Sequence, residues 1–341
     1  MRASVVAMRQ RGGRLLARLV GWLEHWSDDL STWKVLTVLV IGALFGLFIL
    51  FFNFHWWDDR HRDFAGMSTF VLWAGLMSAQ TALWALGLAW LLPSLAGLCR
   101  RDDDTEDVRR ELFGRKSELW LSIAALSVTI GLFLVPAAVI KSWPNYMPSH
   151  DWKLGILTLT GVIAGLVAAS GVWLTHGRLK QLLSASDLSD RQVLDEFLSL
   201  QSGFYRFLGT LGAILGLLVL ATSAQRQTVL AYVVYSAPDP KHPPHIDYGY
   251  QFVLVYGLFF SILVAAVFLP TYLTSVSLGS RIRDAVFPPV APTWPRWEQR
   301  LAKRETLGSL LNLQGGPFAQ LKASIAILTP LLGSLVGLLL K

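Results

Sequence analysis

Long apolar blocks with uncharged interiors, separated by shorter polar stretches, dominate the pattern of this chain. Seven such blocks can be marked, at 35–54, 67–98, 119–140, 154–175, 205–224, 250–277 and 318–340. About eighteen helical residues at a rise of about 1.5 Å cover about 27 Å, close to the hydrocarbon thickness of a bilayer. A helix also satisfies its own backbone hydrogen bonds, as lipid requires. The pattern predicts an all-α bundle of seven transmembrane helices.

The seventh block is the one with an alternative interpretation. It runs up to Lys341 and carries Pro330 midway. Proline inside a helix lacks the amide hydrogen and clashes with the preceding turn. We expect this block, within the C-terminal region 318–341, to span the membrane, and a re-entrant or interfacial segment is the alternative.

The polar segments before the first block and between later blocks suggest helices at the membrane surface. Residues 1–32 repeat leucine and tryptophan at helical spacing with arginine on other faces, which is typical of a helix in the headgroup plane. The six-span bundle then covers 33–277. It includes an expected cytoplasmic helix near 189–204, where Ser189 and Gln192 have the spacing of a capping box. This helix is expected to continue into the fifth span.

The segment 278–317 combines several prolines with a short charged helix from about Trp297 to Leu311. Proline-rich sequence is extended and stiff, so we expect a strap along the cytoplasmic face. Docking of a cytoplasmic protein partner is the functional alternative for this segment.

Composition and charge support a membrane class and assign the two sides. Hydrophobic residues make up 53% of the chain and charged residues 16%, against about 25% charged in soluble domains. With the N-terminus inside, 23 of the 30 Lys and Arg residues fall in cytoplasmic segments and 7 outside. Basic residues near spans are retained in the cytoplasm, so this topology explains the net charge of +7. We expect a multi-pass protein of the plasma (inner) membrane, and no nucleic-acid partner.

Four pairs of small residues at four-residue spacing occur inside the blocks. Such pairs let helix backbones approach closely in lipid. They predict packing within the chain or assembly into a homo-oligomer. The pairs are Gly42 with Gly46, Gly161 with Gly165, Gly212 with Gly216, and Gly333 with Gly337.

An acidic cluster follows the second block, where Asp103, Asp104, Asp107 and Glu111 are interspersed with arginines. The spacing resembles the first aspartate-rich motif of membrane prenyltransferases. The resemblance implies that these carboxylates hold Mg²⁺ against a diphosphate, and hence a Mg²⁺-dependent lipid-modifying or prenyl-transferring enzyme. The likeness covers nine residues and lacks the second aspartate motif. A solvated, self-paired charge run is the interpretation we favour.

A second set of polar residues lies in the extracytoplasmic loops, which the expected topology brings to one side of the membrane, opposite the acidic cluster. It includes the histidines at His55, His61, His242 and His245. Imidazole and carboxylate groups are suitable ligands for Zn²⁺ or a pH-responsive site. The spacing matches no zinc signature, so ordinary loop composition is the preferred interpretation, and no metal or cofactor is predicted.

The blocks contain no Asp, Glu, Lys, Arg or His in their interiors, and the chain has no Walker A, HExxH, GxSxG or Rossmann motif. Ion-coupled transport needs an ionisable group at membrane depth, so such a mechanism is disfavoured. The sequence therefore predicts a passive channel or pore, or the membrane subunit of a larger assembly. An anchor that recruits a cytoplasmic partner is the first alternative, and the membrane enzyme is the second.

Overall fold

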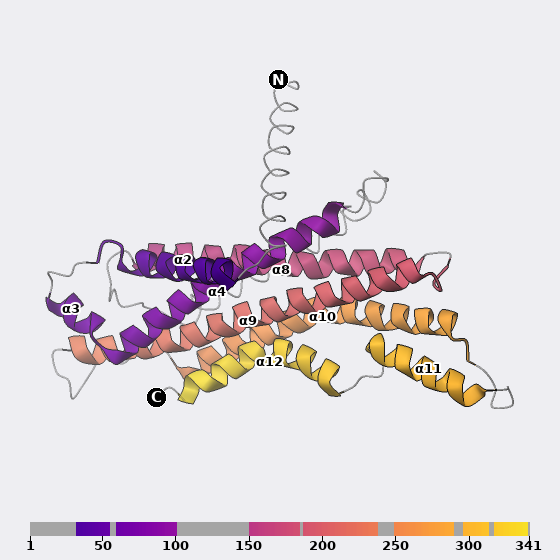
Figure 1. Cartoon of the computed structure of the whole chain (residues 1–341). Helices are drawn as coiled ribbons and strands as arrows, with labels where there is room; N and C mark the ends of the chain where they lie inside the picture. Colours follow the sequence, from indigo (N-terminus) through magenta and orange to yellow (C-terminus); the bar gives the residue numbers. More distant parts are fainter. Residues whose placement is uncertain are drawn as a thin grey trace, which may run out of the picture.

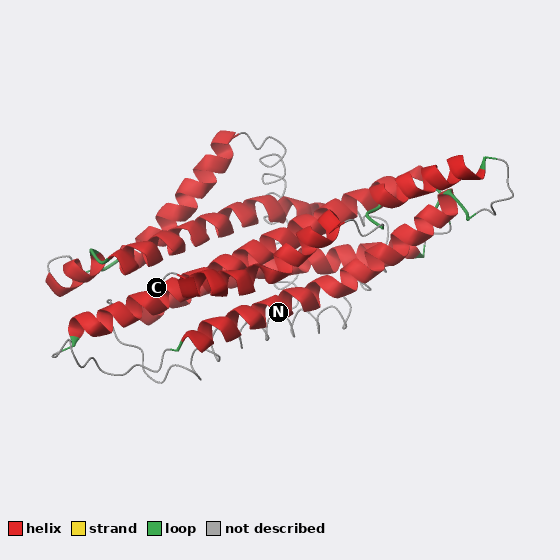
Figure 2. Cartoon of the chain, turned by 90° about the horizontal axis from the view of Figure 1, so that it is seen from below, coloured by secondary structure: helices red, strands yellow, loops and turns green. Residues whose placement is uncertain are grey.

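A computed structural model of the chain describes seven stretches, and every regular element in them is an α-helix (Figure 2). The all-helical class is therefore confirmed for the described residues, and five of their helices are long and apolar enough to cross a membrane. The protein is a membrane-embedded, multi-pass helical protein. The described stretches are 32–54, 59–100, 150–184, 187–237, 249–289, 296–313 and 317–339.

Most predicted blocks coincide with helices that are longer than the blocks themselves. The third block, 119–140, lies outside the described residues, as do residues 1–31. The seventh lies within a helix whose apolar stretch, Ser324–Gly337, is shorter than the other five. The helices are α2 (Thr32–Phe51), α3 (Asp59–Ala65), α4 (Ser68–Arg100), α8 (His150–Leu183), α9 (Arg191–Ser236), α10 (Tyr250–Val286), α11 (Trp297–Leu310) and α12 (Pro317–Leu339).

The start of α9 corrects the predicted capping box. Asp190 is the N-cap, and its carboxylate accepts a hydrogen bond of 3.0 Å from the Gln192 amide. Ser189 instead donates its hydroxyl and its amide hydrogen to Asp187. These two hydrogen bonds hold the pKa of the Asp187 carboxyl below its usual range. Aspartate one residue later offers an equally good cap, which is why the spacing alone chose the wrong residue.

The long helices run along one direction, and the molecule has two distinct ends (Figure 1). We call one the α3 end, where α4, α8 and α10 begin and α2 and α9 finish. The other is the α11 end, where α4, α8 and α10 finish and α9 begins. Two hydrogen bonds fix the direction of α8. Lys153 at its start contacts Leu50 at the finish of α2, and Arg178 near its finish contacts Leu98 near the finish of α4. Helices α4 and α8 are consequently parallel.

Contacts between helices place the predicted blocks at one level of the bundle, which we call the apolar level. Helices α12 and α9 lie side by side in register: Ala326 contacts Gly212, and Gly337 contacts Ser223 further along both helices. The other helices are aligned by four pairs: Ser78 with Ala43, Trp84 with Gly161, Gly171 with Phe207, and Thr271 with Val172.

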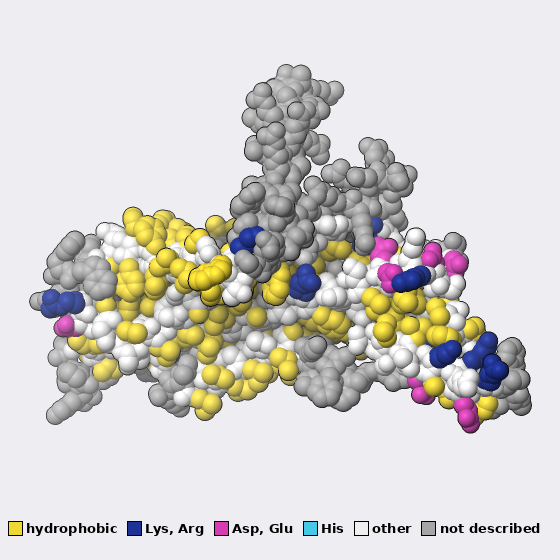
Figure 3. Space-filling view, in the orientation of Figure 1, with side chains coloured by type: hydrophobic (Ala, Val, Ile, Leu, Met, Phe, Trp, Pro, Cys, Tyr) yellow, Lys and Arg dark blue, Asp and Glu magenta, His cyan; other side chains and the backbone are white. Residues whose placement is uncertain are grey.

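Beyond the apolar level, three helices continue toward the α11 end. Helix α9 has 46 residues and is about 69 Å long, more than twice the hydrocarbon thickness of a bilayer. There α8, α9 and α10 enclose a second hydrophobic core, closed by Leu311 after α11. Basic and acidic side chains gather over this end, whereas hydrophobic side chains cover much of the middle of the molecule (Figure 3). We call the part of α8, α9 and α10 around this second core the extension. Its core is formed by Leu179, Phe197, Leu200, Leu278, Ile282 and Leu311.

Candidate functional site

The carboxylate and histidine clusters named from the sequence fall largely outside the described residues. Among the described residues no group of three or more His, Cys, Asp or Glu could hold a metal ion. The helix α3 includes His61, although its side chain is not described. The magnesium and zinc hypotheses therefore stay predictions. The residues outside the described stretches are Asp103, Asp104, Asp107, Glu111, His55, His242 and His245.

The small-residue pairs lie at helix contacts. Gly42 and Gly46 of α2 pack on Thr81 and its neighbours in α4. The closest approach joins α9 to α12: Gly212 faces the Ala326 backbone, and Gly216 faces Thr329. From the other side Gly333 faces the Gly216 carbonyl and Gly337 faces Ser223. The glycine pairs thus bring together helices of the same chain: α2 with α4, α9 with α12, and, through Gly161, α8 with α4.

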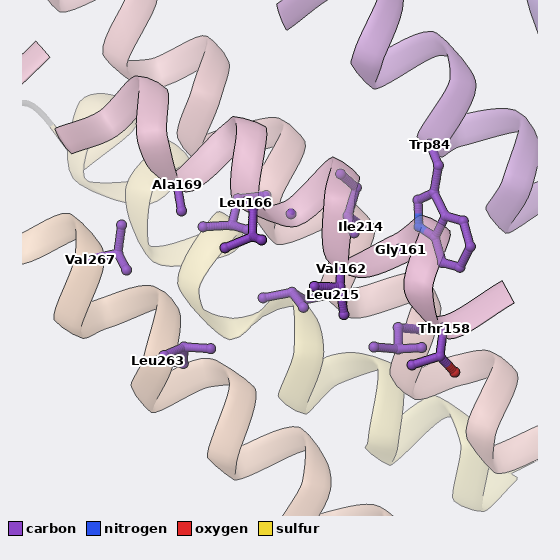
Figure 4. A pocket seen from close by; sticks show the side chains of 13 residues that line it. Trp84, Thr158, Gly161, Val162, Leu166, Ala169, Ile214, Leu215, Leu263 and Val267 are labelled. Carbon is purple, nitrogen blue, oxygen red and sulfur yellow. The ribbon is translucent and has the colours of Figure 1, made fainter. Parts of the chain in front are cut away.

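The fourth pair, Gly161 and Gly165 of α8, behaves differently. A Cβ at Gly161 would lie 2.6 Å from the buried Trp84 ring, whereas a Cβ at Gly165 would meet nothing within 4 Å. Gly165 faces a small cavity of about 40 Å³ at the apolar level, between α8, α9 and α10 (Figure 4). Its other walls are mostly aliphatic, with Trp84 of α4, Thr158 and Gly161 at one end. A site of this size and polarity holds no large ligand.

Two buried polar side chains lie near this cavity on one face of α4. Trp84 is 1% exposed, and its indole nitrogen is on the side of the ring facing the other labelled residues (Figure 4). Gln80, one turn earlier, is fully buried. Neither the indole nitrogen nor the Gln80 amide has a hydrogen-bond partner among the described residues. Unpaired polar groups at membrane depth cost free energy and point to water or a ligand.

A larger, polar cleft lies where α4, α8 and α9 meet on the α11 side of the apolar level. Its volume is about 400 Å³, within the usual range of ligand sites. Four of the lining residues carry a hydroxyl and two are glycines. Arg206 is the only charged residue among the described residues that line the cleft. The lining residues are Ser94, Gly97, Leu98, Thr175, Ser199, Leu200, Ser202, Gly203, Arg206 and Phe207.

Arg206 is held at the mouth of this cleft by two contacts with α4. Its Nη1 donates a hydrogen bond of 3.3 Å to the Ser94 hydroxyl. The guanidinium carbon lies 5.9 Å from the centre of the Trp90 ring, in a cation–π arrangement. A guanidinium has five donor hydrogens, so most of its capacity for an anion is left. In the sequence, Arg206 is only one of the 23 basic residues assigned to the cytoplasmic side.

Lys153 is another residue whose role the sequence did not show. It begins the apolar part of α8, is fully buried, and donates a hydrogen bond of 3.0 Å from Nζ to the Leu50 carbonyl. Leu50 lies in the last turn of α2, where carbonyl groups lack partners within their own helix. An ammonium group there satisfies the carbonyl and complements the helix dipole. The contact fixes α8 against α2 at the α3 end.

Polar contacts attach α11 to the extension. Arg304 Nη2 donates a hydrogen bond of 2.7 Å to the Asp284 carboxylate of α10. Its Nη1 donates to the carbonyl of Phe287, the residue just after α10. The buried Gln201 of α9 donates to the Leu311 carbonyl and accepts from the Asn312 amide. The middle of the charged helix is therefore tied to α10, and the residues that follow its last turn are tied to α9. These contacts hold α11 against the extension.

Comparison of the chain with models of known protein families, with curated proteins and with solved structures finds no match.

Proposed function

We propose that the chain crosses the membrane seven times, with 119–140 as the third span. Helix α4 finishes at the α11 end, and α8 begins at the α3 end. The intervening residues must therefore pass from one side of the apolar level to the other. A single crossing needs about 20 apolar residues, and 119–140 is the one uncharged block between the two helices.

The position of α12 supports its assignment as the seventh span. Ala326 packs at the level of Gly212 and Gly337 at the level of Ser223, so α12 accompanies the fifth block along its length. Pro330 is accommodated because the Leu331 amide donates to the Ser261 hydroxyl of α10, at 3.2 Å. Neighbouring side chains commonly satisfy backbone groups that proline frees in a membrane helix.

The charge distribution supports a cytoplasmic α11 end in the plasma (inner) membrane. Helix α2 begins on the α11 side of the apolar level, so in the proposed topology the chain enters its first span from the side of the extension. Described basic residues on that side include Arg178, Lys180, Arg191, Arg281, Arg283, Arg300, Lys303 and Arg304. Retention of basic segments in the cytoplasm then assigns the side.

For the biochemical role, we propose a membrane subunit of a larger assembly that presents the extension to a cytoplasmic protein. The observation that carries this proposal is the continuity of α9, which passes through the apolar level and the second core without a break. A helix packed in both cores holds the extension rigidly against the membrane part. Exposed Leu301 and Leu310 on α11 offer apolar contacts among charged neighbours.

Site-specific photo-crosslinking in the native cell tests this role. A photoreactive residue at Leu310, which is 52% exposed on α11, should give a protein adduct of one discrete mass. The same residue at Ile163, 48% exposed at the apolar level of α8, is the matched control and should give no soluble-protein adduct. Absence of an adduct at both Leu310 and Leu301 would contradict the proposal.

A passive channel is the second candidate, favoured by the unpartnered Gln80 and Trp84 in the bundle interior. Water along this face of α4 would satisfy both groups. Liposomes with the purified chain should then leak small ions, and Gln80→Leu should reduce the flux at least tenfold. Liposomes that stay tight at high protein density would reject this function.

A further inference from the structure

The cleft between α4, α8 and α9 lies where three apolar blocks end together. The second block finishes at position 98, the fourth at 175 and the fifth begins at 205, and residues at or beside each of these positions line the cleft. This level corresponds to the boundary between hydrocarbon and headgroups. Trp90, which is 47% exposed and lies one turn before Ser94 of the cleft lining, is typical of that boundary.

We propose that this cleft binds the phosphate headgroup of an anionic phospholipid. Arg206 supplies a fixed cation, and among the described residues that line the cleft none carries a carboxylate that would compete for it. Guanidinium groups bind phosphate through paired hydrogen bonds. The hydroxyls of Ser199 and Ser202 form no hydrogen bond within the described part of the chain, so both are available to phosphate oxygens.

The walls of the cleft favour a lipid over free phosphate as the source of this group. Leu98 is the partly exposed leucine of the lining, whereas Leu200 and Phe207 are already buried. A glycerol backbone and the first acyl carbons would cover Leu98 and the exposed Trp90 ring beside Arg206, whereas inorganic phosphate would leave both in contact with water. The proposal concerns the membrane part alone and does not depend on a protein partner at the extension.

Two substitutions address the cleft by different routes. Arg206→Gln removes the charge, and Arg281→Gln, an exposed arginine of α10 outside the cleft, is its control. Gly203→Leu fills the cleft, because a Cβ at Gly203 meets nothing within 4 Å. Gly75→Leu is the matched control, since Gly75 is equally open but lies elsewhere on α4. Gly97→Leu, also open and within the lining, serves if Gly203→Leu fails to fold.

The full chain in neutral detergent is titrated with phosphatidylglycerol, phosphatidylcholine or inorganic phosphate, and bound ligand is counted by native mass spectrometry. We expect one phosphatidylglycerol to bind at least tenfold more tightly than phosphatidylcholine. Arg206→Gln and the filled cleft should each weaken it about tenfold, a typical loss for a charge-assisted hydrogen-bonded contact. Both controls should bind as the unmodified chain does.

Three results would overturn the proposal. Equal binding by Arg206→Gln and the unmodified chain would remove the arginine from the site. An equal loss with Arg281→Gln would show general attraction to basic residues. Displacement of phosphatidylglycerol by inorganic phosphate at similar concentration would make the ligand a free anion instead of a lipid.

Discussion

At the scale of single residues, the two glycines of one small-residue pair have different environments in this bundle. Gly161 and Gly165 form one small-residue pair, yet only Gly161 is in contact with another helix. Gly165 faces the small apolar cavity. Sequence spacing found both positions but could not distinguish them, because the spacing contains no information on which neighbour stands opposite.

The two glycines should respond oppositely to alanine. Gly161→Ala forces a methyl group against the buried Trp84 ring and should cost about 1–3 kcal/mol. Gly165→Ala meets open space and should gain up to about 1 kcal/mol from helix propensity. Thermal unfolding of both variants in the same detergent measures the difference. A loss of stability by Gly165→Ala equal to that of Gly161→Ala would show that the cavity is filled in the protein.

Lys153 should be a structural residue. Lys153→Met leaves the Leu50 carbonyl buried without its donor, so we expect a loss of about 1–3 kcal/mol. Lys180→Met, on the exposed side near the finish of the same helix, should change stability by less than about 0.5 kcal/mol. Denaturant titration followed by tryptophan fluorescence gives both values, and equal values would argue against the carbonyl contact.

At the scale of elements, the close contact of α9 with α12 decides whether the last helix belongs to the bundle. Small residues occur on both helices at matching positions, so their backbones approach more closely than larger side chains would permit. The sequence showed both glycine pairs. It did not show that they face each other, since in lipid the same motif serves equally well between two chains.

This interface gives a second matched test. Gly212→Ala would drive a methyl group into the Ala326 backbone, which cannot move aside as a side chain does, and should cost at least about 1–3 kcal/mol. Gly209→Ala on the same helix meets nothing within 4 Å and should be neutral or stabilising. Protease sensitivity of α12 in detergent should rise only for Gly212→Ala; unchanged sensitivity would contradict the interface.

At the scale of the whole molecule, the proposed topology predicts the side on which each loop is exposed. In a Cys99→Ser background, cysteines replacing Ser117 and Ser309 should react with an impermeant maleimide only from the cytoplasmic side. Cysteines replacing Ser142 and Ser236 should react only from the opposite side. Labelling of intact cells and of inverted vesicles measures both. If Ser117→Cys and Ser142→Cys label from one side, 119–140 does not cross.

The sequence by itself determined the class of this protein and the positions of the apolar helices in the described stretches, because a bilayer imposes length and polarity on every spanning segment regardless of neighbours. Blocks such as 205–224 were located correctly within α9. It also found the charged helix now seen as α11, since Trp297–Leu310 lies between turn-forming residues.

Only the tertiary structure decided what these segments do together. The length of α9 beyond its apolar block, the second core, the polar cleft around Arg206 and the burial of Lys153 all depend on residues far apart in the chain. A polar residue near a block end looks the same in sequence whether it faces water, a carbonyl or a cleft. Its neighbours are set by helix packing, which no local pattern encodes.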